Sequence, residues 1–323
     1  MILVTGGAGF IGSVLIKELN KAGRTDIIVV DRLRDTTKWK NLASSKFEEY
    51  VHADEFLTEQ YTDLHREITF IFHIGACSST TEMNMDYLMV NNVDYSKSLY
   101  MLALERGIPF IYASSAATYG NGDLGYNDDH QTIPKLRPMN PYGYSKQLFD
   151  EWVLKQKDQP PIWFGLKYFN VFGPNEYHKE DMRSLVHKAY GQILDKGQVK
   201  LFKSHKEGFK DGEQLRDFVY VVDIVKAMLE MMKCQNGSGI YNMGTGSERS
   251  FLDLVNATFD SMGKPRKIEF IDMPESIRSQ YQYFTKANMT KFHQLLPQFK
   301  FRSLEDAVKD YVVNFLMKEN QYY

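Results

Sequence analysis

The chain has 323 residues, of which 43% are hydrophobic and 25% are charged, values that are ordinary for a folded globular protein. The net charge is −2 and no long basic block is present, so nothing in the charge pattern indicates a nucleic-acid partner. No apolar run reaches membrane-spanning length, and the two cysteines are too few for a disulfide framework. We therefore expect a cytoplasmic protein without signal peptide, membrane partner or metal site, built as one large or two interlocked domains.

The N-terminal segment joins a short apolar run to a glycine-rich turn. Residues 1–4 fit a buried strand, and Gly6, Gly9 and Gly12 follow at spacings of three. An amphipathic helix is predicted from about residue 13 to residue 21. Glycines let the backbone approach a pyrophosphate, and a helix N-terminus offers free N–H groups to that anion. The order of strand, turn and helix is therefore typical of the opening of a dinucleotide-binding βαβ unit.

An acidic residue follows where such a unit needs one. Residues 27–30 predict a second strand, and Asp31 comes directly after it. In this fingerprint the acid at about that position hydrogen-bonds the adenosine ribose. This second match favours cofactor binding over a glycine turn that holds no ligand.

The segment after Asp31 is basic. Its four cations, Arg32, Arg34, Lys38 and Lys40, exceed Asp31 and Asp35 by two positive charges. One interpretation is a solvated loop; the other is a pocket for a 2′-phosphate, because Asp31 alone would repel NADP. We therefore expect NADP as the cofactor, with NAD as the alternative.

The remaining elements alternate between strands and helices, which predicts an α/β fold with a doubly wound parallel (Rossmann) sheet covered on both faces. Strands are predicted at 69–74, 109–113, 162–168, 199–202 and 239–243, and helices at 85–106, from 141, at 182–196 and from 223. Gly173 and Pro174 interrupt the pattern. Residues 1–172, joined by part of 219–245, are therefore expected to bind the cofactor. Residues 173–323 are expected to form mainly a smaller α/β substrate domain.

Three residues suggest oxidation chemistry. Tyr142 and Lys146 lie four residues apart in a predicted helix and therefore share one face. A tyrosine hydroxyl ordinarily titrates at about 10, but a neighbouring ammonium and an oxidised nicotinamide both favour the phenolate, which makes a better general base. Ser115, after the preceding strand, is suited to hydrogen-bond the oxygen being oxidised. Together they indicate a proton-transfer site rather than three surface side chains.

These motifs resemble a known family. The glycine pattern, Ser115, the Tyr142–Lys146 pair and the Arg-Asp-Phe-Val sequence at 216–219 are similar to the extended short-chain dehydrogenase/reductase family. Within that family, the blocks at 77–82, 112–120, 142–146 and 168–171 most resemble the epimerases that act on C6 of an ADP-linked heptose. The likeness runs from residue 1 to about residue 312.

The resemblance implies a reaction. Bound NADP⁺ takes a hydride from C6, a 6-keto sugar forms, and the hydride returns to the opposite face. Protons must then be handled on two sides of the carbon: by resemblance Tyr142 serves one side and Lys179 the other, although Lys179 alone would be interpreted as a surface lysine. The implied partner is a nucleotide-sugar substrate, and a homo-oligomer is expected.

The resemblance and the residue patterns together define two sets of binding residues. Cofactor contacts are expected at Gly6, Gly9, Phe10, Ile11, Gly12, Asp31, Arg32, Lys38, Ile74, Gly75, Ala76, Cys77, Ser78, Asn91, Lys146, Val171 and Lys179. Substrate contacts are expected at Ser115, Asn170, Asp181, Lys188, Phe202, Lys203, Ser204, His205, Arg216 and Tyr281. Arg216 also makes chemical sense as a bidentate ligand of a diphosphate.

Some positions depart from the family pattern. Lys167 stands where these enzymes often have arginine, and Asp181 and Ala53 replace a serine and a lysine that contact ligands in relatives. Loss of the lysine near the adenosine weakens the argument for NADP. An insertion at 206–213 leaves the nucleotide contacts there open.

Three other functions deserve comparison. Dehydratases of this fold carry an Asp-Glu pair after the serine, where this chain has Ala116 and Ala117, so elimination of water is not expected. A UDP-sugar 4-epimerase needs only one tyrosine, which would leave Lys179 without a role. A non-catalytic NADP-binding sensor would not need Ser115, Tyr142 and Lys146.

Overall fold

A computed structural model describes residues 1–278 and 281–323. These residues form a seven-stranded sheet in which every neighbouring pair is parallel, so the predicted fold class is confirmed. Its strands in spatial order are β10 (Gly239–Met243), β6 (Trp163–Tyr168), β5 (Phe110–Ser115), β4 (Phe70–His73), β1 (Ile2–Thr5), β2 (Ile27–Asp31) and β3 (Glu49–His52). None of the described helices is long and apolar enough to cross a membrane.

Strand β1 lies at the centre of this sheet, between β2 and β4. Its residues Ile2, Leu3 and Val4 are completely buried, as expected for a strand covered on both faces. The order of the strands reverses here, because the chain proceeds outward from β1 to β3 on one side and from β4 to β6 on the other. In open α/β sheets, ligands bind outside the carboxyl ends of the strands at such a reversal.

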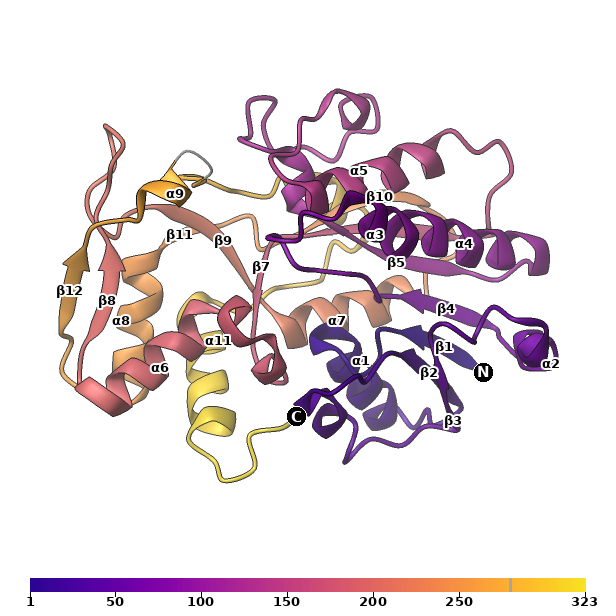
Figure 1. The fold of residues 1–323 in the computed structure, drawn as a ribbon, viewed down its shortest axis with the longest axis horizontal. Helices are drawn as coiled ribbons and strands as arrows, with labels where there is room; N and C mark the ends of the chain where they lie inside the picture. Colours follow the sequence, from indigo (N-terminus) through magenta and orange to yellow (C-terminus); the bar gives the residue numbers. More distant parts are fainter. Residues whose placement is uncertain (279–280) are drawn as a thin grey trace.

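Helices cover both faces of the sheet (Figure 1). On one face α1 (Phe10–Lys21) packs against α7 (Val221–Met231). On the other lie α3 (Met85–Leu88), α4 (Tyr95–Arg106) and α5 (Pro141–Leu154), with α5 against β5. The catalytic residues expected on α5 therefore lie on one side of the sheet, and the glycine turn before α1 lies at its middle strand, β1.

Several predicted boundaries need correction. The helix predicted over 85–106 is present, but residues Met89–Asp94 form a π-helical segment between α3 and α4. Helix α6 begins at Leu185 instead of 182, because the Ser184 side chain accepts a hydrogen bond from the His187 N–H and caps it there. Helix α1 begins at Phe10, three residues before the predicted start, and α7 begins at Val221, two residues before Asp223. The predicted strands at 199–202 and 239–243 match β8 and β10.

The second half of the chain adds smaller sheets and helices, of which β8, β12, α6 and α8 lie on the left in Figure 1. The strands are β7 (Asn170–Phe172), β9 (Leu215–Tyr220) and β11 (Glu248–Ser250) in one sheet, and β8 (Val199–Phe202) with β12 (Ile268–Ile271) in another. The helices are α6 (Leu185–Lys196), α8 (Phe251–Ser261), α9 (Glu275–Arg278), α10 (Thr290–Leu295) and α11 (Leu304–Tyr311); the short α2 (Thr62–Arg66) belongs to the first half. Strand β10 returns to the edge of the large sheet beside β6, so the two halves of the chain interlock.

Candidate active site

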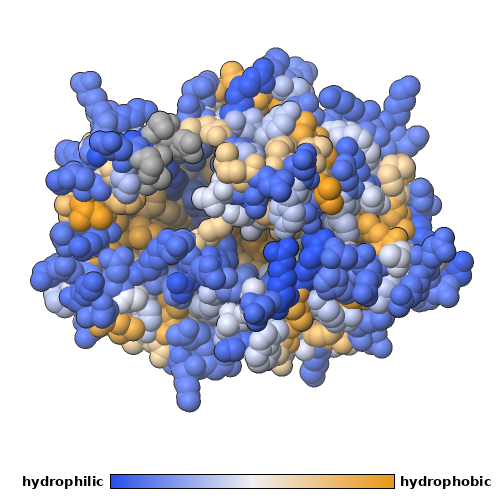
Figure 2. Space-filling model, in the orientation of Figure 1, coloured by the Kyte–Doolittle hydropathy of each residue, from blue (hydrophilic) through white to orange (hydrophobic). Residues whose placement is uncertain are grey.

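A cavity of about 920 Å³ opens at the carboxyl ends of β1, β4 and β5. Its size is typical of a small-molecule site. Its lining comes from both halves of the chain, from Gly6 in the first turn to Phe251, Gln282 and Thr285 in the second half. The face drawn in Figure 2 is largely hydrophilic at its rim and is hollowed near its centre.

The glycine turn shapes the floor of this cavity. Gly6 has a φ of +66°, and a Cβ built on it would lie 2.6 Å from the Gly75 backbone, so a side chain is excluded there. A Cβ on Gly12 would lie 2.2 Å from the Gly6 carbonyl oxygen. Gly9 precedes α1, and no side chain among the described residues caps that helix. Residues 9–12 line the cavity, so the start of the helix faces it. The first N–H groups of α1 are therefore available to an anion, and the turn fits a pyrophosphate group.

Asp31 is the expected ribose ligand, and it is already well supplied with donors. It is 6% exposed and lines the cavity. Its Oδ2 accepts the Ala8 N–H at 2.9 Å, and its Oδ1 accepts the Arg32 N–H at 2.6 Å and the Lys38 ammonium. Lys38 is thus held in an ion pair with Asp31. The carboxylate ties the glycine turn to β2, and its charge is compensated by Lys38.

The basic segment offers less free charge than its sequence predicts. Arg32 forms an ion pair with Asp54, which lies outside the segment 31–40 whose charges were counted from the sequence. Arg34 lines the cavity, and its guanidinium donates to the Tyr87 hydroxyl at 2.8 Å. Within the described part of the chain, no carboxylate pairs with Arg34. Arg32 and Lys38 are thus paired with carboxylates, whereas Arg34 keeps a guanidinium at the cavity that is bonded to a neutral hydroxyl.

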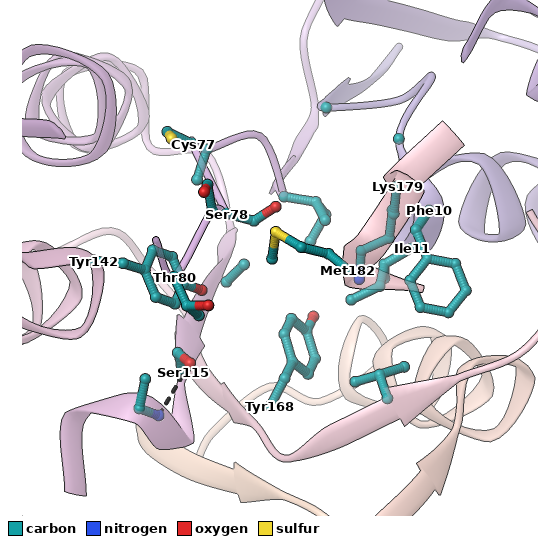
Figure 3. A pocket seen from close by; sticks show the side chains of 18 of the residues that line it. Phe10, Ile11, Cys77, Ser78, Thr80, Ser115, Tyr142, Tyr168, Lys179 and Met182 are labelled. Atoms are coloured by element: carbon teal, nitrogen blue, oxygen red, sulfur yellow. Dashed lines mark hydrogen bonds between the residues drawn. The ribbon is translucent and has the colours of Figure 1, made fainter. Parts of the chain in front are cut away.

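Helix α5 carries one wall of the cavity. The Asn140 side chain accepts the Gly143 N–H at 2.7 Å and caps the helix, and Pro141 occupies its first position. This start brings Tyr142 into the cavity beside Ser115, which ends β5 (Figure 3). One turn later, Lys146 is 4% exposed and its ammonium donates to the Ala113 carbonyl oxygen at 2.9 Å. The three residues expected to act together therefore line one wall.

Burial and the neighbouring Ser115 act in opposite directions on Tyr142. Burial raises the pKa of Tyr142 above its ordinary value, and the nearby Ser115 side chain acts to lower it. Desolvation is the larger of the two effects at this buried position. Burial also lowers the pKa of Lys146, to about 8, while Asp150 raises it.

Lys179 lies across the cavity from Tyr142 (Figure 3). Its ammonium is 5.2 Å from the centre of the Phe10 ring, a cation–π distance. Burial lowers its pKa, and the carboxylate of Glu176 acts in the opposite direction. A lysine with a lowered pKa exchanges a proton more readily near neutral pH than a solvated one. Tyr142 and Lys179 thus face a common space from two sides.

A comparison with known protein families agrees with this geometry. Residues 2–244 match the NAD dependent epimerase/dehydratase family. The chain belongs to this family. The predicted membership is therefore confirmed, and a nicotinamide cofactor is supported for the cavity above the glycine turn.

Individual relatives of this chain point to one particular activity within the family. The chain is 49% identical to the ADP-L-glycero-D-manno-heptose-6-epimerase of Fusobacterium nucleatum, with 100% of both chains covered. Among solved structures it resembles the Helicobacter pylori enzyme of that name at 33% identity and a TM-score of 0.83, covering 97% of this chain and 95% of the other. It also resembles MoeE5 in complex with UDP-glucose and NAD at 25% identity and a TM-score of 0.75, covering 97% of each chain.

The cavity gathers all the cofactor and catalytic residues predicted for this family member. Its lining includes Gly6, Gly9, Phe10, Ile11, Gly12, Asp31, Arg32, Lys38, Ile74, Gly75, Ala76, Cys77, Ser78, Asn91, Ser115, Tyr142, Lys146, Val171 and Lys179. Of the remaining predicted substrate residues, Asn170 also lines it. The others, Asp181, Lys188, Phe202, Lys203, Ser204, His205, Arg216 and Tyr281, lie outside the lining.

The predicted substrate residues outside the lining make contacts within the protein, and Arg216 is the clearest example. Arg216 is 6% exposed, lies 5.5 and 5.4 Å from the ring centres of Phe251 and Tyr281, and donates to the carbonyl oxygens of Leu215 and Gln282. Its guanidinium is thus occupied by the protein instead of extending freely toward a diphosphate. Because Phe251 and Gln282 do line the cavity, Arg216 borders it from behind.

Three other predicted substrate residues outside the lining, Lys188, Lys203 and His205, also bond to residues of the protein. The Lys188 ammonium donates to the Asp181 carbonyl oxygen, and Lys203 pairs with Asp272 at 3.4 Å. The His205 N–H donates to the Tyr283 hydroxyl at 3.0 Å. These residues therefore have partners within the protein and lie outside the cavity lining.

Sequence reasoning missed two residues near the reacting groups. Asn92 is fully buried and joins the loop after β4 to α5: its side chain bonds the Cys77 N–H at 2.8 Å, the Cys77 carbonyl at 3.0 Å and the Ser145 hydroxyl at 2.9 Å. His178 lines the cavity beside Lys179, and burial lowers its pKa to about 4. The position of His178 next to Lys179 in the sequence was the available signal. For Asn92 the signal would have been the π-helical segment, which the sequence does not reveal.

Proposed function

We propose that this chain inverts C6 of the heptose in ADP-D-glycero-D-manno-heptose, giving ADP-L-glycero-D-manno-heptose. The observation that carries the proposal is the pair of proton-transfer candidates, Tyr142 and Lys179, on opposite walls of one cavity above the glycine turn. Inversion requires that a carbonyl oxygen accept a proton while its carbon is approached from either face. A single tyrosine on one wall would serve one face only.

A nicotinamide cofactor, with its pyrophosphate held by Gly6, Gly9 and Gly12, would supply reversible hydride transfer and, in its oxidised form, a positive charge. In the first half-reaction Tyr142 takes the proton of the C6 hydroxyl, and Ser115 hydrogen-bonds the same oxygen. Lys146, held against the Ala113 carbonyl, keeps a positive charge behind the phenolate as it forms. The product of this half is a 6-keto sugar.

In the second half-reaction the ketone presents its other face, and its oxygen lies toward Lys179. The Lys179 ammonium then donates the proton that completes the new hydroxyl. Its lowered pKa supports this role, because a weaker hold on the proton lets the lysine act as an acid near neutral pH. Ala116 and Ala117 also line the cavity and hold no transferable proton, which fits epimerisation better than elimination.

We infer that NADP is preferred to NAD, with Arg34 as the contact to the 2′-phosphate. Arg32 and Lys38 are paired with Asp54 and Asp31, so they contribute mainly by neutralising carboxylates. Arg34→Ala should weaken NADP binding and leave NAD binding nearly unchanged, as measured by titration of both cofactors. Equal affinity of the unaltered protein for NADP and NAD would contradict this preference.

We further propose that residues 1–172, with part of 219–245, hold the cofactor and that residues 173–323 mainly hold the ADP-heptose. Turnover on ADP-D-glycero-D-manno-heptose, followed by NMR of the product at C6, tests the whole function. Production of the L-glycero epimer supports it. Inversion of a UDP-sugar at C4 under the same conditions, with the ADP-heptose unchanged, would favour the alternative epimerase.

A further inference from the structure

A buried ion pair lies directly behind the catalytic wall. The Lys167 ammonium on β6 and the Asp150 carboxylate on α5 are 2.6 Å apart, and both side chains are completely inaccessible to solvent. Lys167 also donates to the Thr118 hydroxyl at 2.7 Å. Isolated buried charges are costly, so a fully buried pair with further hydrogen bonds calls for an explanation beyond stability.

The Asp150 carboxylate is tied to the strand that carries Ser115. Its Oδ1 accepts the Tyr112 hydroxyl at 3.0 Å, and its Oδ2 accepts the Ser114 hydroxyl at 2.7 Å. Between these two donors lies Ala113, whose carbonyl accepts the Lys146 ammonium. The same stretch of β5 is therefore bonded to two successive turns of α5. This arrangement sets the rotation of α5 relative to Ser115.

The spacing along α5 places these groups in a row. Tyr142, Lys146 and Asp150 are each four residues apart, so they share one face of the helix. With Lys167 behind Asp150, the row alternates in charge: a tyrosine that becomes anionic, then a cation, an anion and a cation. Residues four apart on a helix lie about 5–6 Å apart at Cβ, close enough for their charges to interact strongly in a buried setting.

We propose that Asp150, paired with Lys167, is a positioning residue that holds the Lys146 ammonium in place, as a cation, behind the general base Tyr142. This inference rests on the proposed function, because it concerns how the base of that reaction is maintained. Lys146 is buried and its ammonium donates to a neutral carbonyl, so desolvation alone would favour its neutral form. The Asp150 carboxylate opposes that loss, because its negative charge raises the pKa of Lys146.

The other ionisable groups facing Lys146 do not provide the same support. His73 on β4 has its pKa lowered to about 3 by burial and by Lys146, so it is neutral at working pH. Cys77, on the loop after β4, raises the pKa of Lys146 less than Asp150 does. Tyr142 supplies negative charge only once it has given up its proton. Asp150 is thus the carboxylate that acts on Lys146.

The test replaces Asp150 with asparagine, which keeps the shape and removes the charge. In Asp150→Asn, the pKa of Lys146 should fall, so the basic limb of the kcat/KM profile should move to lower pH by about one unit. The double variant Asp150→Asn with Lys167→Met removes the whole pair, guards against misfolding from an unpaired buried lysine, and should show a smaller shift in the same direction. Glu151→Gln is the matched control, because it removes a partly exposed carboxylate from the next position of α5 and should leave the limb in place.

A second measurement separates this inference from the proposed function. In protein labelled at the lysine ε-carbons, the NMR titration of Lys146, assigned with Lys146→Arg, reports its pKa without any turnover. A lower Lys146 pKa in both Asp150 variants, with a normal value in Glu151→Gln, supports the role of Asp150 even if the substrate proves to be another sugar. An unchanged Lys146 pKa and an unchanged basic limb in folded Asp150 variants would overturn it.

Discussion

Gly12 offers a sharp test of the glycine turn, because its substitution is defined by distances to backbone atoms. In Gly12→Ala the added Cβ would lie 2.2 Å from the Gly6 carbonyl oxygen, 2.8 Å from its carbon and 2.9 Å from the Gly7 Cα. Ordinary contact begins at 3.4 Å, so the first turn of α1 and the turn before it must separate by about 1.2 Å. No flexible side chain can absorb this movement.

Two effects follow from that displacement. Overpacking at a tight position costs about 1–3 kcal/mol of stability. A shift of about 1 Å in the groups that hold a reactant lowers turnover by about 10²-fold. Because the Gly6 carbonyl and the N–H groups of α1 move apart, the cradle for the pyrophosphate is lost as well. We therefore expect Gly12→Ala to fold with a lower melting temperature and to bind the nicotinamide cofactor poorly.

Thermal unfolding with and without added NADP measures both effects. The cofactor should raise the melting temperature of the unaltered protein, because it binds only the folded state. That increase should largely disappear in Gly12→Ala. The matched control is Gly191→Ala in the middle of α6, where a Cβ meets nothing within 4 Å and should stabilise the helix by about 0.5–1 kcal/mol. A normal cofactor-induced increase in Gly12→Ala would refute the close packing of the turn as the basis of binding.

Three further outcomes test the chemistry. Tyr142→Phe should lower kcat by about 10²–10⁴-fold with cofactor affinity retained, and half of normal turnover would mean that another residue moves the proton. Lys179→Met should stop inversion while the oxidation that depends on Tyr142 continues, which trapping of the 6-keto sugar would detect; normal inversion would place the second acid elsewhere. In D₂O the product should carry no deuterium at C6, because no adjacent carbonyl acidifies that hydrogen, and deuterium there in proportion to turnover would rule out hydride transfer.

Much of the fold followed from local pattern. The parallel sheet, the helix at 85–106 and the strands at 199–202 and 239–243 were predicted from apolar runs and their spacing. The short strands β3 and β12 were not predicted, since both are edge strands with weak apolar periodicity in which only Val51 of β3 is buried. The start of α6 was misjudged because the decisive cap, Ser184, acts through one hydrogen bond and not through a periodic pattern.

The sequence by itself determined the groups whose spacing is local. Gly6, Gly9 and Gly12 define one turn, and Tyr142 and Lys146 share a helix face whatever surrounds them. Tertiary structure alone decided which distant groups meet: Arg32 with Asp54, Arg216 between Phe251 and Tyr281, and Lys167 behind Asp150. The reason is physical: helix and turn geometry repeats over a few residues, whereas contacts between remote segments depend on how the whole chain packs.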